Sequence, residues 1–245
     1  MSVSVYRSLL RVDARSLLRD PLLGWLLLTP LAIGLLLRYL VPAAAKLLRE
    51  RADFALSPFE PLIMGGFLMT APGILGMVIG FLLLDERDAG TLKALRVTPL
   101  TMRRYLGYRI ALPLTIGIVA TMVSYALVGV AAIPFADLLA IAILASFAAP
   151  LLVLVLATAA ANKVAGFAAV KVINAVNLLP VAAFFVPLPY QLAAGVLPTY
   201  WPMRALWSAA AGEPYAHWLI IGAFVNVGAV VVAMRLFERR LLRSG

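Results

Sequence analysis

Six long apolar segments alternate with short polar segments along the chain. They lie at about 22–41, 62–84, 110–133, 138–161, 166–187 and 217–237. A hydrocarbon core of about 30 Å needs about 20 residues of helix to cross it, so each segment is long enough to span a membrane. The pattern therefore predicts an all-α polytopic membrane protein, in which residues 1–245 form a single transmembrane domain with six transmembrane helices.

The first twenty residues follow a different pattern. Their arginines recur every fourth residue, at Arg7, Arg11, Arg15 and Arg19. We predict that residues 1–20 form an amphipathic interfacial helix, because this spacing puts the arginines on one face, toward anionic lipid headgroups. Asp20 and Pro21 would then be the N-cap and first residue of the next helix. The alternative is a signal peptide, but the apolar segment that follows is long for one.

Composition excludes a soluble domain. Of the 245 residues, 64% are hydrophobic and 13% are charged, whereas about a quarter of residues are charged in soluble domains. The formal net charge of +10 could indicate a nucleic-acid partner. However, the basic residues cluster beside the apolar segments, as membrane topology requires, so we expect membrane lipid and no nucleic acid as a partner. The chain contains no cysteine, which rules out disulfides and thiolate metal sites.

The basic residues are divided unequally between the two ends of the predicted spans. Of 21 lysines and arginines, 16 fall in the N-terminal segment, residues 85–109, the 162–171 turn and the C-terminal tail. Loops rich in lysine and arginine remain in the cytoplasm. Both termini and residues 85–109 are therefore predicted to be cytoplasmic.

Residues 187–207 fit neither a spanning helix nor a solvated loop. The segment is apolar, yet it contains Pro187, Pro189, Pro198 and Pro202. Irregular backbone at membrane depth is tolerated only where protein covers it or where it lines a cavity. We predict an outer re-entrant segment, with Pro198, Tyr200 and Trp201 as an outer gate. An interfacial loop anchored by aromatic residues remains the alternative.

A few small and polar residues interrupt the predicted spans. Asn174 and Asn177 lie in the fifth span, and amides in hydrocarbon seek partners on another helix or in a cavity. Gly73, Gly76 and Gly80 lie in the second span, where small residues allow close helix approach. These five residues are candidates for a substrate pathway or a subunit interface, with internal helix packing as the alternative.

Motifs for catalysis are absent from the sequence. There is no G-x-x-x-x-G-K-[ST] loop to hold ATP phosphates, and neither H-E-x-x-H nor G-x-S-x-G occurs. The only histidine, His217, begins the last predicted span, where an interfacial structural role is expected. We predict that this chain has no catalytic residue, no metal site and no cofactor of its own.

Residues 85–109 form a charged segment that is too polar for lipid and too short to fold as a domain. Within it, Thr91 can cap a short helix on which Leu92 and Leu95 share one face. Thr98 and Pro99 would end that helix. The acidic residues that precede it could pair with arginine on a partner or with Arg103, Arg104 or Arg109 of this chain.

The order of residues in this segment resembles the cytoplasmic loop of type-2 ABC exporter permeases. The residues that match the family motif by position are Glu86, Gly90, Thr91, Leu92, Leu95, Thr98 and Pro99. Residues 197–202 also resemble the outer segment of bacterial drug-export-like members. An amphipathic helix, six spans and a broken outer segment before the last span match the family over the whole chain.

The resemblance implies a permease subunit in a bacterial cytoplasmic membrane. Two permease chains, identical or different, would form the pore, and each would seat its coupling helix on a separate ATPase subunit that binds ATP and Mg. ATP-driven closure of the ATPases would export a hydrophobic or amphipathic compound, drug-like or lipid-like, by alternating access. The alternatives are a permease for a lipid-linked glycan or an ion, and a membrane enzyme or scaffold without an ATPase. In a further alternative, the charged segment serves only membrane topology.

Overall fold

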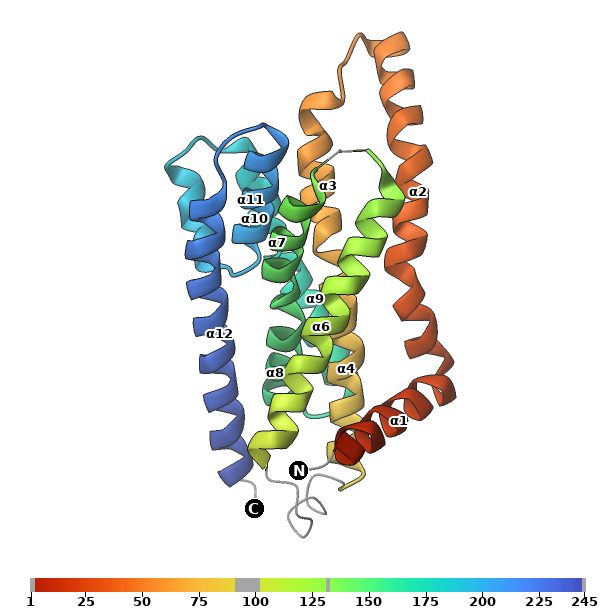
Figure 1. Ribbon diagram of the computed structural model, residues 1–245, viewed down its shortest axis with the longest axis vertical. Coiled ribbons are helices and arrows are strands. Elements are labelled where there is room, and N and C mark those ends of the chain that lie inside the picture. The colour runs from red at the N-terminus through yellow and green to blue at the C-terminus, as the bar shows by residue number, and fades with distance from the viewer. Residues whose placement is uncertain (1–2, 91–101, 131–132, 244–245) are drawn as a thin grey trace.

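The computed structural model describes residues 3–90, 102–130 and 133–243, which form helices joined by short turns and contain no β-strand (Figure 1). The helices are α1 (Val3–Arg19), α2 (Pro21–Ala52), η1 (Ser57–Phe59), α3 (Glu60–Leu68), α4 (Thr70–Asp88), α6 (Met102–Val128), α7 (Phe135–Ser146), α8 (Ala148–Ala159), α9 (Lys163–Val176), α10 (Leu178–Ala182), η3 (Ala183–Phe185), η4 (Tyr190–Val196), α11 (Tyr200–Ala210) and α12 (Ala216–Arg243). Within these residues, six helices or runs of adjoining helices are long and apolar enough to cross a membrane. The predicted fold class is therefore confirmed.

Three of the spans are each interrupted by a break that lies three residues before a proline. The breaks are at Met69, Phe147 and Asn177, and the prolines are Pro72, Pro150 and Pro180. A proline ring collides with the carbonyl group four residues earlier and offers it no N–H. In each case this carbonyl belongs to the last residue of the preceding helix, so the break relieves the clash that the proline would cause.

The centre of the helix bundle is the contact between α4 and α8. The span containing α4 is 72% buried and the one containing α8 is 61% buried, against 17% for the spans of α2 and α9. Glycines allow this close approach, since a Cβ atom on Gly76 would lie 2.7 Å from the carbonyl oxygen of Ala149. A Cβ atom on Gly80 would lie 2.7 Å from a methyl group of Leu156.

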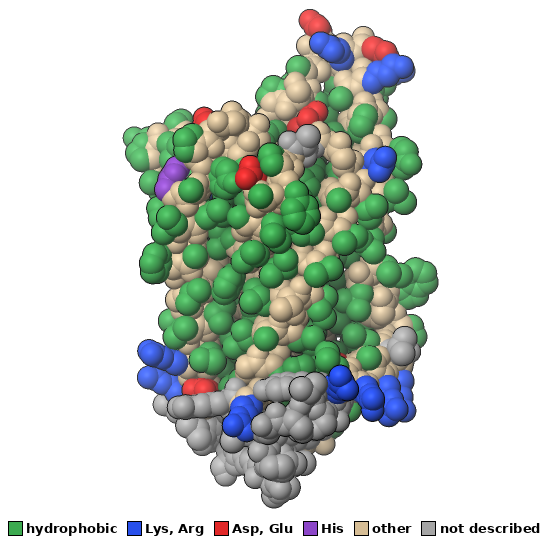
Figure 2. All heavy atoms as spheres, viewed as in Figure 1, with side chains coloured by type: hydrophobic (Ala, Val, Ile, Leu, Met, Phe, Trp, Pro, Cys, Tyr) green, Lys and Arg blue, Asp and Glu red, His purple; other side chains and the backbone are tan. Residues whose placement is uncertain are grey.

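Helix α1 turns into α2 at Asp20, the predicted N-cap. The Asp20 carboxylate accepts hydrogen bonds from the backbone N–H groups of Leu22, at 3.1 Å, and Leu23, at 3.3 Å. Figure 1 shows α1 lying across the end of the bundle at which α12 finishes. Most blue arginine and lysine side chains in Figure 2 gather at that end, while green apolar side chains cover the middle. This arrangement fits a helix lying along one membrane face.

The segment between the last two spans is covered by protein on several sides. Its helices η4 and α11 lie at the end of the bundle opposite α1 (Figure 1), and α11 packs against α3, α7 and α12. Tyr200 and Trp201 at the start of α11 are buried. The apolar and proline-rich character of residues 187–207 thus coincides with burial against neighbouring helices.

Candidate functional site

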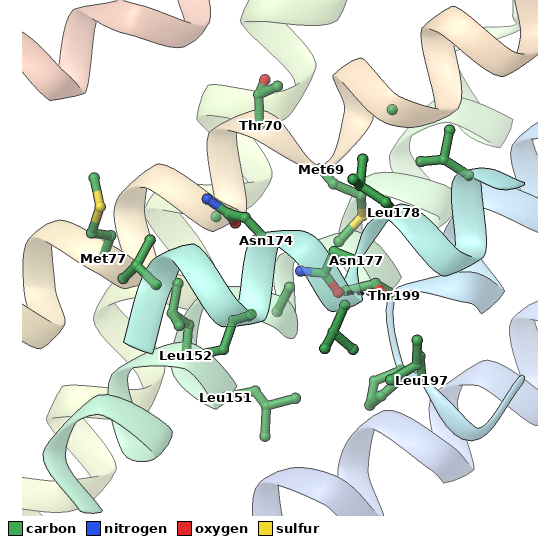
Figure 3. Close-up of a pocket in the computed structure, with 18 of the residues that line it drawn as sticks. Met69, Thr70, Met77, Leu151, Leu152, Asn174, Asn177, Leu178, Leu197 and Thr199 are labelled. Atoms are coloured by element: carbon green, nitrogen blue, oxygen red, sulfur yellow. Dashed lines mark hydrogen bonds between the residues drawn. The ribbon is translucent and has the colours of Figure 1, made fainter. Parts of the chain in front are cut away.

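A cavity of about 600 Å³ lies between α4, α8, α9 and the residues just before α11 (Figure 3). Its walls are mainly aliphatic and thioether side chains, including Met69, Met77, Leu151, Leu152 and Ile173. The polar side chains on the wall are Thr70, Asn174, Asn177 and Thr199. Among the described residues that line it, none carries a charge. Such a site suits a compound that is mostly apolar and has a few hydrogen-bonding groups.

The helix breaks explain why this space is open. Met69 and Asn177, at two of the breaks, line the cavity, as does Ala148, which follows the third. Gly66 and Gly73 also line it, and a Cβ atom added to either would meet no atom within 4 Å. Interrupted helices at membrane depth are tolerated where they line a cavity, because other groups can then satisfy the backbone.

The residues predicted for a pathway or subunit interface divide into two groups. Gly73, Asn174 and Asn177 lie on the cavity wall, whereas Gly76 and Gly80 lie outside it and pack against α8. The cavity residues Thr70 and Met77 were not among the residues predicted from the sequence. Thr70 could have been identified from the sequence, because it is a hydroxyl residue within a long apolar segment.

The residues predicted for an outer gate also take different places. Pro198 lines the cavity, but the lining does not include Tyr200 or Trp201. Tyr200 donates a hydrogen bond to Gln191 Oε1 at 3.2 Å, and the indole N–H of Trp201 donates to the Gly195 carbonyl at 2.9 Å. Both aromatic residues therefore connect the start of α11 to η4 through hydrogen bonds.

A buried cluster of charged and phenolic groups lies at the inner end of the bundle, the end that carries α1. Its centre is Arg109 of α6, whose side chain is 0% exposed. The Arg109 guanidinium pairs with Asp13 of α1 at 3.1 Å and forms a close ion pair with Glu86 of α4. Two carboxylates offset the cost of taking this cation out of water. The sequence suggested three arginines of this chain as partners for the acidic residues, and Glu86 pairs with one of them, Arg109.

Two tyrosines complete the hydrogen bonding of this cluster. The hydroxyl of Tyr108 donates to Asp13 at 2.7 Å, and the hydroxyl of Tyr105 donates to Glu86. The Tyr105 hydroxyl also accepts a hydrogen bond from Arg109 Nε at 3.0 Å. Asp13, Glu86 and Arg109 therefore connect α1, α4 and α6 through groups that are all paired.

The residues on either side of Glu86 connect α4 to two further helices. Asp85 pairs with Lys163, the first residue of α9, at 2.8 Å, and Lys163 also pairs with Asp20 at 3.2 Å. The Arg87 guanidinium donates to three backbone carbonyls at the end of α8, those of Ala157, Ala160 and Ala161, at 3.3, 2.8 and 2.6 Å. The last turn of α4 is thereby linked to α6, α8 and α9.

The Asp20 carboxylate is charged well into acidic solution. Partial burial raises the pKa of Asp20, but the hydrogen bonds and charge of Lys163 and the backbone N–H groups of Leu22 and Leu23 outweigh this effect. The pKa of Asp20 is therefore lowered overall. The pairing between Asp20 and Lys163 should persist throughout the neutral range.

Gly90 follows α4 with a φ of +73°, the left-handed conformation that glycine adopts most easily and that commonly ends a helix. The other residues predicted for ATPase coupling are Thr91, Leu92, Leu95, Thr98 and Pro99, and they lie outside the described residues. The linked last turn of α4 lies immediately before them in the sequence.

Six spanning helices, three of them broken beside an uncharged cavity, define a membrane permease, a protein that moves a compound across the bilayer. The chain belongs to the family of Rv2686c-like fluoroquinolones export permease proteins, whose family model matches residues 13–234. It is 34% identical over 235 residues to the fluoroquinolones export permease proteins of two strains of Mycobacterium tuberculosis, CDC 1551 and H37Rv. The match covers 94% of this chain and 92% of each relative.

No solved structure matches the chain. The family nevertheless confirms the resemblance to ABC exporter permeases that residues 85–109 indicated.

Proposed function

We propose that the chain is the membrane subunit of an ATP-driven exporter that moves amphipathic drug-like compounds, fluoroquinolones among them, out of a bacterial cell. The observation that carries this proposal is the cavity bordered by Met69, Ala148 and Asn177, because its wall has hydrogen-bonding groups but no charge. The relatives, which are named as fluoroquinolone exporters, supply the drug class. A lipid-linked glycan or an ion would need more polar or charged groups than this wall offers.

Energy would come from a separate ATPase subunit that binds ATP and Mg, because this chain has no phosphate-binding loop. Leu92 and Leu95 would dock in an apolar groove of that subunit, on the cytoplasmic side where both termini also lie. Two permease chains, identical or different, would form the complete pore. The ion pair between Asp85 and Lys163 joins the last turn of α4 to α9, a wall of the cavity. Movement of the coupling segment would thus be transmitted to the drug site. This movement would drive alternating access.

The role of the cavity in drug export can be tested by filling the cavity with a large side chain. In Gly73→Trp, the indole would occupy the open space beside α4, so export of a fluorescent fluoroquinolone should fall at least about tenfold, as a blocked site requires. The matched control is Gly228→Trp, since an added Cβ atom there also meets nothing within 4 Å but Gly228 does not line the cavity. Drug accumulation in cells that express the chain with its ATPase is the measurement. Normal export by Gly73→Trp would remove the cavity from the mechanism.

Coupling is tested in the same cells with Leu92→Asp/Leu95→Asp. Burying a leucine contributes about 1.5–3 kcal/mol, and a charge in an apolar groove costs more, so the ATPase should no longer co-purify. Leu47→Asp/Phe54→Asp, which alters two exposed residues at the other end of the bundle, should leave co-purification unchanged. If the first variant holds its ATPase and exports as before, residues 91–101 are not the coupling element.

A further inference from the structure

Residues 197–199 form a partition between the cavity and a second hollow. All three residues line the cavity, and Leu197 also lines the second hollow, which has a volume of about 490 Å³ and is bordered by α10, η3 and η4. The second hollow lies toward the end of the bundle opposite α1, where these elements are found in Figure 1. A compound that moved from the cavity into the second hollow would pass this partition.

One side of the partition is fixed to α12. The buried Asn226 of α12 donates a hydrogen bond to the Pro198 carbonyl at 3.1 Å and another to the Gly222 carbonyl of its own helix at 2.9 Å. Trp201 packs so closely against α12 that a Cβ atom on Gly222 would lie 2.6 Å from it. These contacts leave little freedom between the partition and α12.

Among the described residues, one side-chain hydrogen bond connects the other side of the partition to the residue that follows α9. Thr199 Oγ1 donates to Asn177 Oδ1 at 3.0 Å, across the wall of the cavity (Figure 3). Asn177 lies at the break before Pro180, which has no N–H to offer the Val176 carbonyl, so a bend there does not break that helix hydrogen bond.

Both ends of the broken fifth span are anchored, which concentrates any bending at Asn177. Lys163 fixes the inner end of α9 through Asp85 and Asp20. Phe184 of η3 packs edge-on against Trp207 of α11, with ring centroids 5.1 Å apart. Between these anchors, α9 buries little surface, as its span is only 17% buried.

We propose that the hydrogen bond between Thr199 and Asn177 is a latch that holds the outer end of the cavity shut. When it breaks, α9 and α10 bend away from the partition at Asn177, and the two hollows join past Leu197. The use of this opening as a drug exit rests on the proposed function. The latch itself is tested without drug or ATPase.

The test uses Gly73→Cys as a reporter inside the cavity, in a chain that has no other cysteine. Right-side-out membrane vesicles are treated with a small membrane-impermeant thiol reagent, and the labelling rate is measured. Adding Thr199→Val keeps the side-chain shape and removes the donor. Losing one hydrogen bond should raise the labelling rate about three- to tenfold. Asn177→Ala, which removes the acceptor from the other side, should raise it by a similar factor.

The matched control is Thr115→Val, because the Thr115 hydroxyl bonds only to carbonyls of its own helix, at 2.9 and 3.0 Å. The control should leave the labelling rate unchanged. The exchanged pair Asn177→Thr/Thr199→Asn can rebuild the bond and should restore slow labelling. Unchanged labelling in both Thr199→Val and Asn177→Ala overturns the latch, as does an equal rise in Thr115→Val. Failure of the unsubstituted chain to export drug would instead overturn the proposed function and leave the labelling result intact.

Discussion

Arg109 shows how one residue can decide the structure of the inner end of the bundle. It lies near the start of α6 and is completely shielded from solvent. Removing one member of a buried ion pair costs more than the pair itself contributes, because the remaining charge keeps no partner. Here two carboxylates, Asp13 and Glu86, depend on the same guanidinium.

Arg109→Met should therefore destabilise the chain by about 3–5 kcal/mol, with a lower midpoint of thermal unfolding in detergent. Adding Asp13→Asn and Glu86→Gln should recover part of the loss, because the orphaned charges disappear. Arg38→Met serves as the control, since the Arg38 guanidinium makes one exposed contact, to the Leu127 carbonyl at 3.4 Å. An unfolding midpoint equal to that of the unsubstituted chain in Arg109→Met would show that the cluster contributes nothing to stability.

At the scale of helices, two adjacent parts of the surface of α4 meet different surroundings. Gly76 lets α4 touch α8, whereas Gly73 lies one turn earlier and leaves the cavity open. The two glycines are chemically identical, and they lie only three residues apart in one helix. What differs is the neighbour that each one meets.

A pair of alanine substitutions distinguishes these surroundings. Gly76→Ala would place a methyl group 2.7 Å from the Ala149 carbonyl oxygen, and such overpacking costs about 1–3 kcal/mol. Gly73→Ala meets no atom and should be neutral or stabilising by up to about 1 kcal/mol, because alanine favours the helix. Thermal unfolding of both variants in the same detergent is the measurement. Equal midpoints for the two variants would contradict the packing of α4 on α8.

For the whole molecule, charge sets the expected direction across the membrane. Most arginine and lysine side chains gather at the end that holds α1 and the end of α12 (Figure 2), while the opposite end carries fewer. The positive-inside rule predicts that the end rich in arginine and lysine is cytoplasmic, which is where the proposed ATPase would bind.

Single cysteines test this orientation in intact cells, because the chain has none of its own. Ala52→Cys, exposed at the end of α2, should react rapidly with a membrane-impermeant thiol reagent. Ala161→Cys, exposed in the turn between α8 and α9, should react only after the cells are opened. The reverse pattern of labelling would invert the proposed topology and with it the direction of transport.

The sequence alone determined the number and approximate position of the spans, the N-cap at Asp20 and the family. Each of these depends on local information, namely a run of apolar residues, a side chain that bonds its neighbours' backbone, and a motif of fixed spacing. The same holds for the uneven distribution of arginine and lysine. Membrane insertion depends on hydrophobicity summed over a segment, so no knowledge of neighbouring helices was needed.

The tertiary structure alone decided which residues face the cavity, which partner Glu86 takes and where the spans break. Proline does not settle the breaks by itself, since Pro30, Pro42 and Pro113 lie inside continuous helices. The partner of Glu86 was open among several arginines until α6 was seen to place Arg109 beside it. Such choices depend on contacts between segments far apart in the chain, and a local sequence pattern does not contain the positions of those segments.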